Sequence, residues 1–147
     1  MATPIITEKE LRIWCTDRPE LNTLVDGVRF APEDIEQAMI NTVDRFNIIP
    51  PPTGINYTVE NFPSRSMLST GAMGWLLKGA AIGEASNHMQ YSAMGIQVDD
   101  RDKAQLFASM GDNLWQEFID FGKQYKLAQN IARVYGVTNS EYRWRAF

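Results

Sequence analysis

The chain has 147 residues, of which 44% are hydrophobic and 22% are charged. This length and composition are sufficient for one folded domain and exclude a chain that is disordered throughout. The net charge is −4, with −5 over residues 1–63 and +2 over residues 133–147, a distribution that disfavours nonspecific nucleic-acid binding and places a basic tail on an acidic body.

The first predicted element is a short helix over residues 7–15, in the stretch "TEKELRIWC". Thr7 is followed three residues later by Glu10, which is the spacing of a capping box, and the apolar residues begin at Leu11.

A second helix is predicted from "FAPEDIEQAMINTVDRFN". Pro32 suits a first turn, and Glu33 and Asp34 lie where the positive end of the helix dipole favours acids. One buried stripe is expected at helical spacing, formed by Ile35, Met39, Thr42, Val43 and Phe46.

Residues 48–63 are predicted to form an extended loop flanked by prolines. Pro50 to Pro52 end the preceding helix, because proline lacks an N–H and restricts the residue before it. Ile55, Tyr57 and Val59 alternate with polar residues, which is typical of a short strand or an extended arm. A loop of this length in a compact domain is commonly a contact element.

A third helix is predicted from its cap at Ser64 through Met94. Glycines stand at positions 71, 74, 79 and 83, and each costs up to about 1 kcal/mol in a helix interior. Either another helix of the same chain approaches closely, or a second subunit approaches at Gly71, Gly74 and Gly79. The pattern leaves both interpretations open.

A fourth helix is predicted from a cap at Asp99 or Asp100 to Tyr135, on the order of 50 Å at 1.5 Å per residue. Gly111 and Gly122 are candidate bends. The expected buried stripe comprises Phe107, Met110, Leu114, Phe118, Phe121, Tyr125, Ala128, Ala132 and Tyr135.

The residues that usually carry chemistry are sparse. His88 is the only histidine and Cys15 the only cysteine, and Cys15 on an apolar helix is typical of a small buried hydrophobic residue. The acidic cluster "DDRD" at 99–102 lacks the spacing of a calcium loop and suits a helix cap. We therefore expect no enzymatic activity, no cofactor and no metal; an enzyme would require an essential His88.

No signal peptide is recognised in "MATPIITEKE", and the longest apolar stretch, around Lys78, covers about 13 residues where about 20 are needed to span a bilayer. We therefore expect synthesis in the cytoplasm and no membrane partner.

The last residues, "VTNSEYRWRAF" at 137–147, have two faces when extended. Tyr142 and Trp144 lie on one side, and Arg143 and Arg145 lie on the other. Tyr, Trp and Arg are the side chains that most often dominate interfaces, so this segment is predicted to dock on a partner. The alternative is a tail that packs on its own domain.

The predicted architecture is all-α: a small helical bundle over residues 1–136 with a long C-terminal helix, an extended loop at about 48–63 and an extended C-terminal arm at 137–147. This order of elements, with "FAPEDIEQAMINTVDRFN" and "SEYRWRAF" as its most specific parts, resembles the head–tail connector (adaptor, or head-completion) proteins of tailed bacteriophages.

The resemblance implies a non-enzymatic virion protein at the head–tail junction that forms a homo-oligomeric ring, binds the portal protein through its arm and carries the next neck or tail protein. Genomic DNA would pass through the ring without specific binding. The portal-binding residues would be Tyr142, Arg143, Trp144, Arg145 and Phe147. The subunit-interface residues would be Tyr57, Val59, Gly71, Gly74 and Gly79.

Two other functions remain open at this point. Another neck or baseplate protein would have similar helical parts. A small helical DNA-binding or regulatory protein would need a basic recognition helix, and the acids and bases of residues 99–135 are nearly balanced, which disfavours it.

Overall fold

The computed structural model describes residues 5–22, 27–86, 90–93, 96–99 and 101–135. Within them the chain forms four α-helices and one two-stranded hairpin. The helices are α1 (Glu8–Trp14), α2 (Pro32–Ile48), α3 (Arg65–Ser86) and α4 (Arg101–Tyr135), and the strands are β1 (Gln90–Ala93) and β2 (Ile96–Asp99). The all-α class and the long last helix are thereby confirmed.

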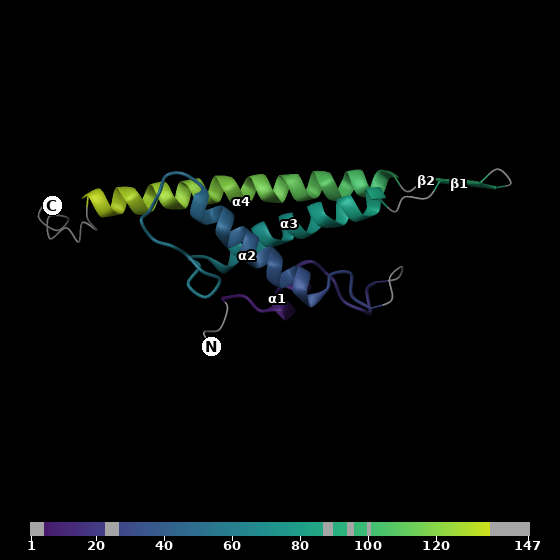
Figure 1. Cartoon of the computed structure of the whole chain (residues 1–147), viewed down its shortest axis with the longest axis horizontal. Coiled ribbons are helices and arrows are strands. Elements are labelled where there is room, and N and C mark those ends of the chain that lie inside the picture. Colours follow the sequence, from purple (N-terminus) through teal and green to yellow (C-terminus); the bar gives the residue numbers. More distant parts are fainter. Residues whose placement is uncertain (1–4, 23–26, 87–89, 94–95, 100, 136–147) are drawn as a thin grey trace, which may run out of the picture.

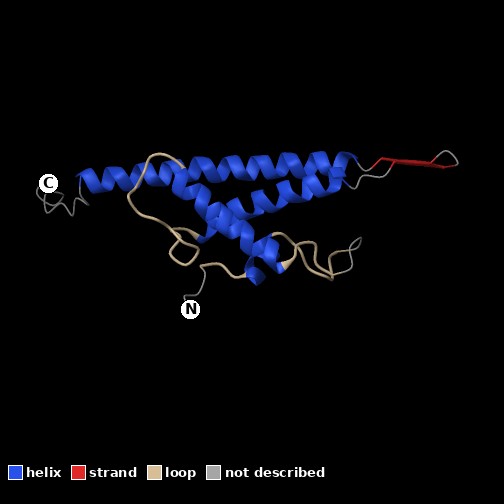
Figure 2. Cartoon of the chain, viewed as in Figure 1, coloured by secondary structure: helices blue, strands red, loops and turns tan. Residues whose placement is uncertain are grey.

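The molecule is elongated along α4 (Figure 1). Helix α3 runs antiparallel beside α4, α2 crosses them, and α1 lies on the far side of α2 (Figure 1). The hairpin projects from the end where α3 and α4 meet, and α4 extends beyond α2 and α3 at the other end (Figure 2).

The first two helices begin as their sequences predict. The Thr7 side chain accepts a hydrogen bond from the Glu10 N–H, and the Glu10 carboxylate accepts one from the Thr7 N–H at 2.9 Å, which completes the capping box. Pro32 opens α2, and every residue of the predicted α2 stripe is buried. The turn before α2 is organised by the buried Asp17 carboxylate, which accepts hydrogen bonds from the N–H groups of Arg29 and Phe30.

The core is centred on Phe46 of α2. Its ring makes edge contacts with Tyr57 and Phe62 of the loop, at centroid distances of 5.2 and 4.9 Å, and faces Phe118 and Tyr125 of α4 at 6.4 and 6.2 Å. These aromatic pairs join α2, the loop at 49–64 and α4 in one cluster.

Two predictions about helices are corrected. The third helix ends at Ser86 and not at Met94, and the hairpin follows it, with Tyr91 paired to Val98. Ile96 and Val98 are β-branched and alternate with polar residues, a pattern that favours a strand over a helix. The extended loop predicted at 48–63 is confirmed, and of the two forms left open for residues 55–59 the structure shows the extended one and not a strand.

The buried face of α4 also differs from the predicted stripe. Phe118 is buried as expected, but Met110 is 47% exposed and Phe121 is 52% exposed. The face toward α2 and α3 includes Gly111 and Gly122, which pack against other helices, so the helix passes through both without a break.

Candidate functional site

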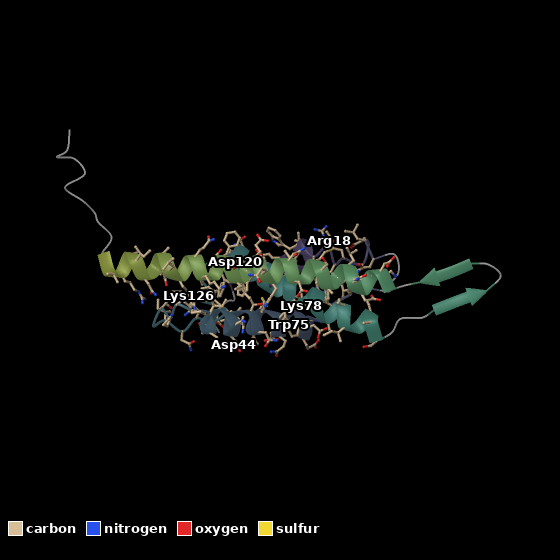
Figure 3. All side chains as sticks on the ribbon, turned by 90° about the horizontal axis from the view of Figure 1, so that it is seen from above. Arg18, Asp44, Trp75, Lys78, Asp120 and Lys126 are labelled. Carbon is tan, nitrogen blue, oxygen red and sulfur yellow. The ribbon has the colours of Figure 1, made fainter. Side chains whose placement is uncertain are left out.

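The end of α4 from which the last residues leave is held by a row of side-chain donors. Lys126 is only 1% exposed, and its Nζ donates to the carbonyl oxygens of Ile49 at 2.6 Å and Asn47 at 3.2 Å. These carbonyls belong to the C-terminal end of α2, where helix carbonyls lack partners and a cation is favoured. Figure 3 shows Lys126 on the side of α4 that faces this part of the chain.

Two further side chains of α4 continue the row along the same loop. The Asn130 Nδ2 donates to the Pro52 carbonyl at 3.0 Å, and the Arg133 guanidinium donates to the Thr53 carbonyl. The spacing 126, 130 and 133 puts all three donors on one face of the helix. We call Lys126, Asn130 and Arg133 the α4 clamp.

The clamp also reaches the proline triplet, at its last residue. Prolines cannot donate to a partner, but their carbonyls still need hydrogen bonds, and the clamp supplies a donor to Pro52.

Burial lowers the pKa of Lys126, and its Nζ also lies 4.8 Å from the centre of the Phe46 ring, a favourable cation–π distance.

The second part of the loop is fixed by Tyr57. Its N–H donates to Asn47 Oδ1 at 2.9 Å, its carbonyl accepts from Asn47 Nδ2 at 3.0 Å, and its hydroxyl donates to Gln129 at 3.0 Å. Tyr57 is 7% exposed and belongs to the core, and Val59 packs partly against that core. Tyr57 therefore makes its contacts within its own chain and exposes almost no surface to a neighbouring subunit.

The four glycines of α3 divide into two pairs. A Cβ atom at Gly71 would lie 2.4 Å from Thr42 Cγ2, and one at Gly74 would lie 3.0 Å from the Trp115 backbone nitrogen. For this pair the structure favours the intramolecular interpretation, because α2 and α4 fill the space. At Gly79 and Gly83 a Cβ atom would meet no described residue within 4 Å.

The open pair lies in a groove of about 440 Å³ between α3 and the start of α2. Its apolar lining includes Phe30, Trp75 and Ala80, and its carboxylates are Asp34 and Glu84. We call this surface the α3 groove.

The α4 clamp holds a helix end that carries exposed apolar residues. Leu127, Ile131 and Val134 are exposed, the last of them at 77%. The predicted portal-binding residues, Tyr142 to Arg145 and Phe147, lie outside the described residues and follow directly from this end of α4.

The residues considered for chemistry are not brought together in the described part of the chain. Burial raises the pKa of the Cys15 thiol to about 11, with the Asp17 carboxylate contributing, so the thiol is protonated at neutral pH. His88 lies outside the described residues. Where side chains are described, no group of three His, Cys, Asp or Glu residues could hold a metal ion. The described helices include none long and apolar enough to cross a membrane.

No family model, curated protein or solved structure matches this chain. The geometry of its own surfaces is therefore the basis for any functional assignment.

Sequence reasoning missed the α4 clamp. Lys126 was counted only as one charge of a balanced helix, whereas the structure buries it. No local signal marks it, because its acceptors are backbone carbonyls of residues 47–53, which lie far from α4 in the sequence.

Proposed function

We propose that this chain is a structural virion protein of a tailed phage, a ring-forming head–tail connector that binds the portal protein through residues 142–147 and carries the next neck or tail component. The proposal rests on the resemblance of its elements to such connectors. It is supported by one structural observation: the α4 clamp holds the helix end from which the aromatic and basic tail leaves.

A tail that docks on a partner benefits from a fixed point of departure. Ordering a segment on binding costs conformational entropy, and a rigid anchor reduces the number of arrangements that must be lost. The clamp holds α4 to the loop through Lys126, Asn130 and Arg133, two of which bond carbonyls at Pro52 and Thr53. This design suits a connector that must present its arm in one direction.

The charge of the body suits passage of DNA without retention. Glu33, Glu36 and Asp44 are exposed on α2, and an acidic wall repels the phosphate backbone. The end that carries β1 and β2 lies opposite the end of α4 at Tyr135 (Figure 1), so the two ends are available to two different partners.

The first experiment is quantitative mass spectrometry of purified particles from the encoding phage, with copies of this chain counted per portal subunit. We expect a ratio near one, which a connector ring on the portal requires. Absence from particles would overturn the proposal, and a large excess would instead assign the chain to a repeating tail or capsid element.

The second experiment tests the arm. Trp144→Ala should weaken portal binding by roughly 2 kcal/mol, the scale of a buried aromatic anchor. Trp14→Ala is the matched control, because Trp14 is an exposed tryptophan on α1 outside the arm. Equal portal affinity for the two variants would remove Trp144 from the docking residues.

A further inference from the structure

The α3 groove contains two glycines that the fold of this chain does not require. Gly79 and Gly83 are exposed, and a Cβ atom at either position would meet nothing in the described structure within 4 Å. Their lack of side chains keeps the groove open beside Trp75, which is only partly buried. The opening of about 440 Å³ is large enough to receive an aromatic side chain.

The rim of the groove carries two carboxylates. Asp34 belongs to the first turn of α2 and Glu84 to the last turns of α3. Arg29 also lines the groove, but its guanidinium lies over the Phe107 ring of α4, 4.8 Å from the ring centre. A ligand with an apolar face and cationic side chains would match the apolar lining and the two carboxylates of the groove.

One segment of this chain has that chemistry and lies outside the described structure. When residues 142–147 are extended, Trp144 projects from one side and Arg143 and Arg145 from the other. Trp144 can enter the groove while the arginines, whose long side chains can bend back around the backbone, reach Asp34 and Glu84 on the rim.

The length of the tail decides which copy it comes from. The Lys78 Nζ pairs with Asp112 at 2.8 Å, which places the groove beside the first third of α4. Asp112 is about 35 Å from Tyr135 along the helix, whereas Trp144 extends at most about 32 Å from Tyr135, even before it turns around α3. To reach its own groove the tail would have to be almost fully extended along α4 and then turn around α3, so a second copy is the better donor of Trp144.

We propose that the α3 groove binds residues 142–147 of a second copy of this chain. Because groove and arm are different surfaces at different ends of the molecule, the contact is heterologous and can continue from copy to copy. This inference goes beyond portal docking and concerns the free protein. One arm cannot bind a groove and a portal at the same time. On assembly, each arm would therefore leave the groove of the neighbouring copy and bind the portal.

The decisive experiment mixes two full-length variants in sedimentation velocity. Glu84→Arg damages the groove and keeps the arm, whereas Arg143→Ala with Arg145→Ala damages the arm and keeps the groove, and these alanines cannot pair with the arginine introduced at position 84. Each variant alone should remain monomeric, and the mixture should form a 1:1 dimer, because one intact groove meets one intact arm. A mixture that stays monomeric, or either variant associating alone, would overturn the proposal.

A binding measurement locates the contact. A fluorescein-labelled peptide of residues 137–147 is titrated with the arm-damaged full chain and followed by anisotropy. Adding Glu84→Arg or Gly79→Leu should weaken binding at least about tenfold. Adding Glu36→Arg, an exposed acid of α2 outside this groove, should change it less than about twofold. No saturable binding below about 1 mM, or equal loss with Glu36→Arg, would overturn the assignment.

Gly79→Leu also separates misfolding from lost docking. The position has open space and leucine is a better helix former than glycine, so this variant should keep or raise its melting temperature while losing the peptide. The particle counts test the connector assignment and the mixture tests the groove, so either proposal can fail alone.

Discussion

The two halves of α3 use the same residue type in opposite ways. In the first half, Gly71 and Gly74 lie close to α2 and α4, and a Cβ atom added to either glycine would collide with atoms of these neighbouring helices. In the second half, Gly79 and Gly83 face a groove in which an added carbon would meet none of the described residues within 4 Å. The difference separates glycines that the fold needs from glycines that only an external partner would need.

The largest loss of stability is expected in the first half of α3, where the glycines pack against α2 and α4. Gly71→Val should lower the free energy of unfolding by about 3 kcal/mol, because its Cβ would lie 2.4 Å from Thr42 and 2.9 Å from the Phe118 ring. Both neighbours are fully buried and have little room to move. Urea denaturation followed by far-UV circular dichroism measures the loss. An unchanged midpoint would mean that α2 and α4 can separate from α3 without penalty.

The clamp provides the next largest effect. Lys126→Met keeps the aliphatic stem and removes the burial of a charge, but leaves the carbonyls of Asn47 and Ile49 without their donor. A lost donor to buried carbonyls outweighs the saved desolvation, so we expect about 2 kcal/mol lower stability.

Lys123→Met is the matched control for the clamp. It lies on the same helix with a half-exposed side chain and a 4.0 Å pair with Asp120, so its effect should stay within about 0.5 kcal/mol. Equal effects at the two positions would show that the Lys126 hydrogen bonds contribute nothing specific.

The elements that were predicted correctly are those whose signals are local. The capping box at Thr7, the proline start and apolar stripe of α2, and the end of α4 near Tyr135 all follow from neighbouring residues. Local propensity and hydrophobic period are sufficient for such features.

The missed features depend on what lies across the fold. The buried face of α4 includes two glycines and a lysine, which a search for hydrophobic residues at helical spacing cannot find. The first strand of the hairpin was assigned to the third helix because it has only four residues and follows that helix closely in the sequence. The α3 groove could not be foreseen, because only the structure shows which glycines are left unpacked.

In the second half of α3, where the glycines are exposed, substitution should raise the free energy of unfolding instead of lowering it. Gly79→Ala removes backbone entropy from the unfolded chain and meets no neighbour in the fold, so it should raise the free energy of unfolding by up to about 1 kcal/mol. Gly83→Ala should do the same. Thermal denaturation at low protein concentration measures the gain. A loss at either position would mean that the second half of α3 is packed more tightly than its described surroundings indicate.

The smallest effect on stability is expected from removal of residues 137–147. This truncation tests directly whether the exposed half of α3 binds the arm of another copy. The described residues form a core cluster that joins the four helices and the loop at 49–64, so we expect the truncated chain at low concentration to match the full chain within about 0.5 kcal/mol. A loss of more than about 2 kcal/mol there would show that the tail packs on its own domain. At high concentration the two chains should differ, because binding between copies stabilises the folded state by mass action. The melting temperature of the full chain should therefore rise with concentration, while that of the truncated chain stays constant, since only the full chain carries an arm for the groove beside Gly79 and Gly83.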